Sequence, residues 1–156
     1  MVINSIEKGI VIDHLKAGNG SKILNYLGIN TDKHTVAFLM NASSQQFGKK
    51  DVIKITNVSA EEIDLAVLGL IDPDCTVNVI EDHTIIKKLQ PVIPTLVQNV
   101  ILCKNPRCIT SVEGNIDHIF HLINPEKREY RCEYCDEIIS MQKDNIQKIL
   151  SKNEGK

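Results

Sequence analysis

The hydrophobic and polar positions of the first 90 residues follow two different periods along the chain. Short runs rich in β-branched residues predict strands, and apolar residues three or four positions apart predict one face of a helix. One helix is expected between the Gly18–Ser21 turn and Gly28, a residue type that often ends helices. Its apolar face consists of Ile23, Leu24 and Leu27. The strands expected in this region are residues 10–14, 35–40, 51–56, 76–80 and 84–88.

A second helix is expected after Ser59. Ser59 and Glu62 match the capping-box pattern, in which two side chains three residues apart bond each other's backbone N–H. The apolar positions that follow at helical spacing are Ile63, Ala66, Val67 and Leu70. Residues 43–48 are polar and suit a connection between antiparallel strands, so the element order is β-α-β-β-α-β-β. This order predicts an α+β domain with a ferredoxin-like antiparallel sheet, two helices on one face and one additional strand.

The segment Gln90–Pro94 contains two prolines, which cannot donate backbone hydrogen bonds and disfavour helix before them. We therefore expect a first domain at residues 1–94 and a second at 95–156. Residues 100–102, 118–123 and 128–131 are predicted strands of a small all-β domain. They deliver two close cysteine pairs, Cys103 with Cys108 and Cys132 with Cys135, as in a zinc-ribbon-like domain. Residues 141–156 are polar and are expected to form either a helix or a C-terminal tail.

Composition and charge narrow the class of protein. The 156 residues are 42% hydrophobic and 24% charged, with a net charge of −2, which is typical of a globular protein. No apolar run approaches the ~18 residues needed to cross a bilayer, and Met1–Ser5 lacks a signal-peptide pattern. We expect a cytoplasmic protein without a membrane partner. Dispersed basic residues and an aromatic content of 4% argue against nucleic acid as a partner.

Four of the five cysteines form two close pairs. Cys103 and Cys108 are separated by 4 residues, Cys132 and Cys135 by 2, and the pairs by 23. In a reducing compartment this spacing is typical of a metal site. Four thiolates close a tetrahedral shell, so we predict one structural Zn²⁺ per chain. An iron centre and four unrelated buried cysteines are the alternatives.

Other candidate chemistry is weaker. His118 and His121 could replace a thiolate, but their β-branched neighbours favour ordinary strand residues, and Cys75 is expected to be a small buried hydrophobe. We find no activated nucleophile, paired carboxylates or glycine-rich phosphate loop, so we expect no enzyme activity. A zinc-ribbon module for nucleic acid is the main alternative function, and a redox or metal-dependent enzyme is the second.

Polar residues in the first domain suggest a ligand site. Strand ends can converge at one edge of the expected sheet, where a carboxylate, an imidazole and lysines would suit a sugar and phosphates. From the residues alone, ordinary solvated side chains are the simpler explanation. The candidates are Asp13, His14, Lys50, Lys54, Asn78 and Lys88.

Several segments together resemble the regulatory chain of aspartate carbamoyltransferase, in order from about Ile3 to Ile139. They are Ile10–His14, Gly48–Ile55, Thr76–Ile80 and the cysteine quartet with its frame Asn99–Ile109. The resemblance implies a nucleotide-binding domain followed by a zinc domain that docks on catalytic chains. It also implies regulation of pyrimidine biosynthesis by CTP, ATP or UTP. The expected assembly is a dodecamer of two catalytic trimers and three regulatory dimers.

The resemblance also implies roles for residues at matching positions. Asp13 would contact the ribose, Lys54 the base or ribose, and Lys88 the triphosphate. His14 would be a further phosphate contact, and Lys50 would lie near a second nucleotide. The residues expected to line the base and sugar are Ile6, Asn78, Ile80 and Ile85. The chain departs from the family pattern at His83, which stands in place of a tyrosine, and at Val79 and Gln90, which stand in place of arginines.

Overall fold

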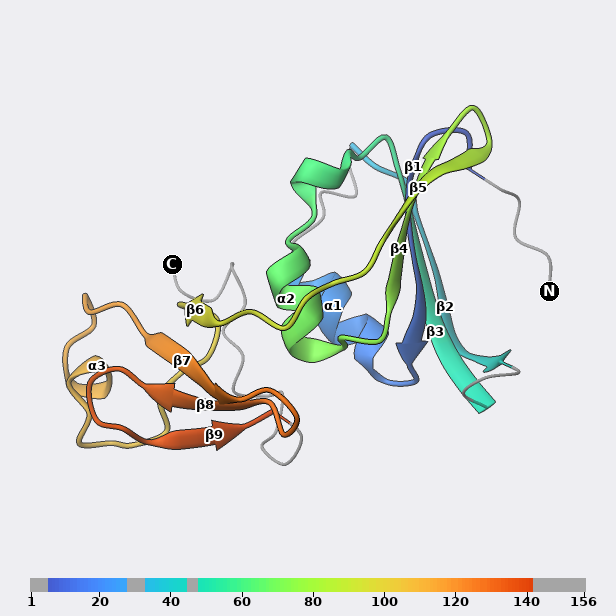
Figure 1. Cartoon of the computed structure of the whole chain (residues 1–156). Coiled ribbons are helices and arrows are strands. Elements are labelled where there is room, and N and C mark those ends of the chain that lie inside the picture. The colour runs from blue at the N-terminus through green and yellow to red at the C-terminus, as the bar shows by residue number, and fades with distance from the viewer. Residues whose placement is uncertain (1–5, 28–32, 45–47, 142–156) are drawn as a thin grey trace. The chain divides into compact units, whose positions relative to one another are not determined.

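A computed structural model of the chain describes residues 6–27, 33–44 and 48–141 (Figure 1). The chain divides into two compact units, Met1–Val92 and Ile93–Lys156, at a point inside the proline-containing segment. Among the described residues, no helix has the length and apolar character needed to cross a membrane. Gly28 and the polar residues after Met141 lie outside the described part of the chain.

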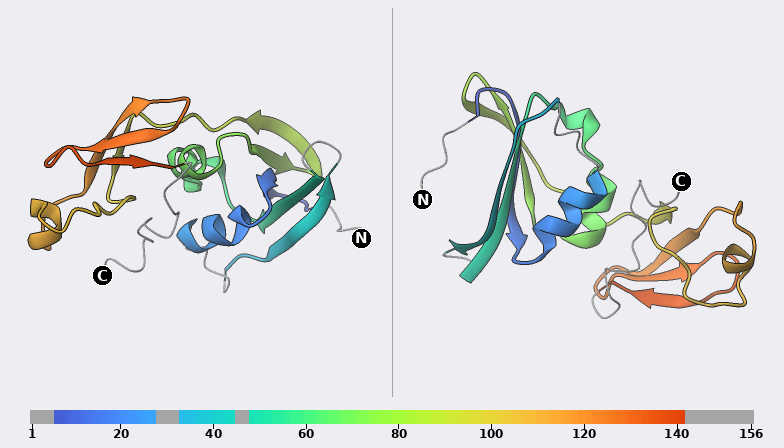
Figure 2. Two further views of the ribbon diagram at one scale, coloured as in Figure 1. Left: turned by 90° about the horizontal axis from the view of Figure 1, so that it is seen from below. Right: turned by 180° about the vertical axis from the view of Figure 1, so that it is seen from behind.

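The first unit is a five-stranded antiparallel sheet with the strand order β2-β3-β1-β4-β5. Helices α1 and α2 lie on one face of the sheet, and no described helix covers the other face (Figures 1 and 2). The expected element order is therefore present. The strands are β1 (Gly9–Lys16), β2 (Val36–Ser44), β3 (Gly48–Thr56), β4 (Thr76–Glu81) and β5 (Thr84–Leu89). The helices are α1 (Asn19–Leu27), the 3-10 turn η1 (Ala60–Glu62) and α2 (Leu65–Ile71).

The core of the first unit lies between the sheet and these helices. In β1 and β3, Ile10 pairs with Ile55 and Ile12 with Ile53, and all four are fully buried. Successive side chains of a strand point to opposite faces. The alternate positions of these strands, including Asp13 and Lys54, therefore belong to the open face. The helical side chains that complete the core are Ile23, Val67, Leu68 and Leu70.

The second helix begins later than predicted. The Ser59–Glu62 capping box is present, with the Glu62 carboxylate accepting the Ser59 N–H at 2.7 Å, but it caps only η1. Ile63 is extended, and α2 starts at Leu65. Asp64 caps α2 because its carboxylate accepts the N–H groups of the second and third helical residues, at 3.1 and 3.3 Å.

The hairpin of β2 and β3 is longer than predicted. Residues expected to form a polar loop continue the ladder through the pairs Ala42↔Lys50 and Ser44↔Gly48. A register shift between Leu39 and Ala42 accommodates the extension, and Asn41 there has a φ of 57°. Polarity indicated a loop because it does not distinguish a loop from the exposed end of a hairpin, and both Ser43 and Gly48 are exposed.

Asp51, in β3, binds backbone N–H groups from two other segments of the first unit. Its side chain is 1% exposed, and one oxygen accepts the Gly18 and Gly20 N–H groups at 3.0 Å each. The other oxygen accepts the Asn41 N–H at 2.8 Å. The carboxylate therefore fixes the start of α1 and the irregular part of β2.

Asp51→Asn is expected to destabilise the first unit by about 3 kcal/mol. An asparagine side chain has only one acceptor oxygen, and its NH2 group would face a backbone N–H donor where the second carboxylate oxygen now accepts a hydrogen bond. Urea titration monitored on NMR signals of β1 and β3 measures this loss. Asp74→Asn is the matched control, since Asp74 is exposed. Equal midpoints for the two variants would contradict the role given to Asp51.

The second unit is a four-stranded antiparallel sheet with the order β6-β7-β8-β9. Its strands are β6 (Leu96–Gln98), β7 (Ile119–Asn124), β8 (Glu129–Cys132) and β9 (Ile138–Ser140), and α3 is Ile109–Val112. Phe120 and Tyr130 are fully buried at its centre. The Tyr130 hydroxyl donates to the Pro94 carbonyl at 2.7 Å, which fixes the chain where it enters this unit.

One predicted strand of the second unit is wrong, and two strands were missed. Residues 100–102 form no strand, and only Ile101 takes part in an isolated bridge. Val100 and Ile101 are 6% and 1% exposed, so their apolar character reflects burial and not ladder pairing. β6 and β9 have three residues each, which is too short for periodicity to identify.

Candidate metal centre and ligand-binding face

Four cysteine sulfurs meet in the second unit. The Sγ atoms of Cys103, Cys108, Cys132 and Cys135 all lie within 4.8 Å of one another. Cys103 Sγ is 3.5 Å from Cys135 Sγ, and Cys108 Sγ is 3.7 Å from Cys132 Sγ. A tetrahedral ion with Zn–S bonds of about 2.3 Å would place sulfurs about 3.8 Å apart. The donor set and its spacing therefore fit a single bound cation.

Each cysteine pair is shaped by a short backbone turn. The Cys108 N–H donates to the Asn105 carbonyl at 3.1 Å, which curls the chain back between the first pair. The Asp136 N–H donates to the Cys132 carbonyl at 3.1 Å, and Asp136 has a φ of 64°. Burial raises the pKa of the Cys103 and Cys132 thiols, so a cation must displace protons when it binds.

The nearby histidines face other partners. His118 Nδ1 lies 3.3 Å from the Cys103 backbone N–H and accepts its hydrogen, and burial lowers the pKa of this ring. His121 Nε2 pairs with the Glu133 carboxylate at 3.0 Å. Within the described residues, the group of possible metal ligands contains four sulfurs and no imidazole. Cys75 belongs to the first unit, where it is fully buried, and burial raises its pKa to about 12.

The open face of the first unit carries a row of polar side chains across its strands. Val11 of β1 pairs with Lys54 of β3 on one side and with Asn78 of β4 on the other. Asn78 in turn pairs with Lys88 of β5. Strands lie about 4.8 Å apart, so the Cα atoms of Lys54 and Lys88 are about 14 Å from each other. The positively charged side chains of Lys54 and Lys88 therefore lie on either side of Val11 and Asn78, which occupy the two central strands of this row.

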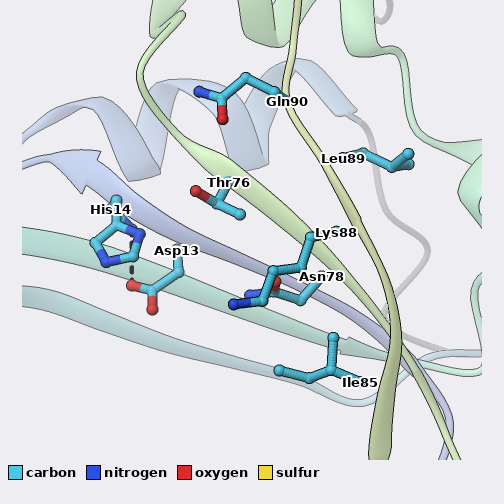
Figure 3. Close-up of a pocket in the computed structure, with 8 residues that line it drawn as sticks. All are labelled: Asp13, His14, Thr76, Asn78, Ile85, Lys88, Leu89 and Gln90. Carbon is cyan, nitrogen blue, oxygen red and sulfur yellow. Dashed lines mark hydrogen bonds between the residues drawn. The ribbon is translucent and has the colours of Figure 1, made fainter.

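A cavity of about 400 Å³ opens beside this row (Figure 3). Its volume is in the range of small-molecule sites. Figure 3 shows Lys88 lying beside Asn78, with Asp13 and His14 approaching from β1. The residues that line it are Asp13, His14, Thr76, Asn78, Ile85, Lys88, Leu89 and Gln90.

A bulge in β1 positions the acidic end of the cavity. The pairing of β1 with β3 shifts register between Ile12 and Leu15, and His14 has a φ of 61°. Asp13 Oδ1 accepts the His14 N–H at 2.7 Å and pairs with Lys50 Nζ at 3.0 Å. The bulge thus turns a carboxylate and an imidazole toward the same opening.

Asn78 presents an unsatisfied polar atom in this cavity. The side chain is 9% exposed, and its Oδ1 has no hydrogen-bond partner among the described residues. Buried polar atoms are nearly always paired because desolvation without a partner is costly. A ligand with a donor group would satisfy this oxygen.

The predicted polar cluster is divided between two cavities. Lys50 and Lys54 line a second opening of about 600 Å³, on the same face, together with Leu39, Met40, Ala42, Ser43 and Val52. The Asp13–Lys50 ion pair connects the two openings. Ile80, which is 8% exposed, and Ile6, which is half-buried, line neither of them.

Some lining residues were not among the predicted contacts. Thr76 and Gln90 line the first cavity, and the Gln90 amide donates weakly to the Pro73 and Cys75 carbonyls at 3.5 and 3.4 Å. Thr76 is two positions before Asn78 in a strand, and residues two apart in a strand point to the same face. This period of two could have identified Thr76 from the sequence. The departures His83 and Val79 do not line this cavity.

The two units together define a two-domain binding protein, with ligand-sized cavities on an open sheet face and a four-cysteine metal-binding domain. Residues 1–92 match the family described as aspartate carbamoyltransferase regulatory chain, allosteric domain. Residues 95–145 match the metal binding domain of the same regulatory chain. The chain belongs to the family of aspartate carbamoyltransferase regulatory chains, regulatory subunits of pyrimidine biosynthesis.

Individual relatives can be aligned with this chain over nearly their whole length. The regulatory chain of Clostridium botulinum (strain Hall) is 54% identical over 140 residues, covering 90% of this chain and 94% of the relative. That of Clostridium tetani is 55% identical over 138 residues, covering 88% and 95%. That of Bifidobacterium longum is 46% identical over 137 residues, covering 88% and 97%.

Proposed function

We propose that the open sheet face of residues 1–94 binds nucleotide effectors, with CTP, ATP and UTP as the candidates. The observation that carries this proposal is the cavity of about 400 Å³ lined by Asp13, Lys88 and Asn78. The buried side-chain oxygen of Asn78 has no hydrogen-bond partner among the described residues. Asp13 would accept ribose hydroxyls, and Lys88 with His14 would bind phosphate oxygens. The base and sugar would be lined by Ile6, Asn78, Ile80 and Ile85. Lys54 and Lys50, in the second cavity, would serve the base or ribose and a second nucleotide.

We also propose that the bound metal is one structural Zn²⁺ per chain, held by the four cysteines. Four sulfurs complete a tetrahedral shell and leave no position for water or substrate, which is typical of structural zinc. Iron shares this donor set, and metal analysis separates the two. The strand order and the metal site suit a ferredoxin-like sheet with one added strand, followed by a zinc-ribbon-like domain.

A regulatory chain acts through the catalytic chain with which it associates. We propose that residues 95–156 make this contact, and that regulatory dimers bridge catalytic trimers into a dodecamer in the cytosol. A nucleotide that binds two quaternary states differently would shift their equilibrium by about 1–3 kcal/mol.

Reconstitution with the catalytic chain tests this function. The mixture is expected to form one large particle whose mass, measured by light scattering, corresponds to six chains of each kind. CTP or ATP is expected to change the aspartate concentration needed for half-maximal activity of this particle. The isolated catalytic trimer is the control and should not respond. A full-sized particle that binds neither nucleotide would contradict the effector site.

A further inference from the structure

Thr110 is a buried polar side chain beside the cysteine cluster. It is 5% exposed, and its Oγ1 lies 3.0 Å from Cys108 Sγ, itself on a residue that is only 2% exposed. A hydroxyl has one hydrogen to donate, whereas a metal-bound thiolate can only accept. With a cation in the cluster, the hydrogen in this contact therefore belongs to Thr110.

The local turn determines where the hydroxyl lies. Cys108 is the N-cap of α3, and its carbonyl accepts the N–H groups of Ser111 at 2.9 Å and Val112 at 3.2 Å. This turn places the second helical residue, Thr110, over the sulfur of the cap. The Cys103 and Cys132 sulfurs face the sulfurs of Cys135 and Cys108, at 3.5 and 3.7 Å.

We propose that Thr110 is a positioning residue for the metal, donating its hydroxyl hydrogen to the Cys108 thiolate. The bond would hold this sulfur in its orientation toward the metal, so that the thiolate is displaced more slowly. It would also withdraw negative charge from the sulfur, which an absorption band can report. Residues that hydrogen-bond metal ligands typically change metal affinity by about 10–100-fold. This inference rests on the metal site proposed above.

The test uses the full-length chain loaded with Co²⁺, whose sulfur-to-metal absorption band reports charge on the thiolates. Thr110→Val retains the shape of the side chain and removes the hydroxyl. Its band is expected at longer wavelength, because a thiolate without the hydrogen bond gives up an electron more easily. Release of Co²⁺ to a chelator is expected to be about 10-fold faster. Thr110→Ser restores the hydroxyl and is expected to return both measurements to those of the unmodified chain.

Ser111→Ala is the matched control. The Ser111 hydroxyl, on the next residue of α3, donates to two backbone carbonyls, of Asn105 at 2.8 Å and of Cys103 at 3.5 Å. Its removal should leave the band in place. A Thr110→Val variant that takes up no Co²⁺, with uptake restored in Thr110→Ser, would support the proposal in a stronger form.

Two results would overturn the inference. One is a Thr110→Val variant with an unshifted band and an unchanged release rate. The other is an equal change in the valine and serine variants, which would point to packing of the methyl group that serine lacks. Failure of the unmodified chain to bind Co²⁺ would instead overturn the metal site itself, so the two failures are distinguishable.

Discussion

Cys132→Ser is expected to remove the metal and unfold the second unit while the first unit stays folded. Structural zinc contributes roughly 10–16 kcal/mol in small domains, and a unit of about 50–60 residues has too little core to replace it. Cys132 is fully buried within the cluster, so no neighbouring sulfur can substitute for it without rearrangement. Metal analysis should fall from one ion per chain to none. NMR signals of β7 and β8 should collapse while those of β1 and β3 persist.

The same variant is expected to lose its association with the catalytic chain, measured as the mass of the mixture. Cys75→Ala is the matched control, because Cys75 is also buried but lies in the first unit. It should retain the metal and the large particle, with only a local loss of packing. A Cys132→Ser chain that is metal-free and still forms the full particle would refute a metal-dependent docking domain.

Lys88→Met is expected to weaken binding of CTP and ATP by about 10–100-fold. Hydrogen bonds to charged groups contribute about 1.5–3 kcal/mol, and among the described residues Lys88 is the lysine that lines the cavity together with Asn78. Methionine retains most of the apolar stem, so the loss should report the charge. Isothermal titration of the full-length chain measures it, and the effect should be smaller for the nucleoside than for the triphosphate.

Lys87→Met provides a control with the same change of charge. Lys87 pairs with Val79 in the adjacent position of β5, so its side chain belongs to the helix-covered face of the sheet. Nucleotide affinity should remain within about twofold of the unmodified chain, which corresponds to roughly 0.4 kcal/mol. Equal losses in the two variants would indicate a diffuse electrostatic effect and would contradict a defined phosphate contact.

Local signals identified most elements but not every boundary. The β-branched runs located β1, β4 and β5 because strand formation and burial both select such residues there. The start of α2 was misplaced because Ser59 and Asp64 are both competent caps. Which cap begins the longer helix depends on how the apolar face of α2 meets the sheet, and this contact is not visible in local sequence.

The candidate sites differ in how far the sequence could define them. The four cysteines come together as their spacing predicted, because short-range pairs carry their geometry within one turn. Asp13, His14, Asn78, Ile85 and Lys88 were all singled out and line one cavity. The separation of Lys50 and Lys54 into a second cavity was not predicted, since it depends on register and on the β1 bulge.

The sequence by itself determined most elements of the first unit and the cysteine cluster, because periodicity and spacing are local properties of the chain. Only the tertiary structure decided how polar residues divide over the open face, that Asp51 binds three backbone N–H groups, and that the Thr110 hydroxyl lies at the Cys108 sulfur. These arrangements arise from pairing between distant strands and from a helical turn that projects one side chain over another. Such contacts depend on where the backbone brings residues together, and residue type alone does not encode them.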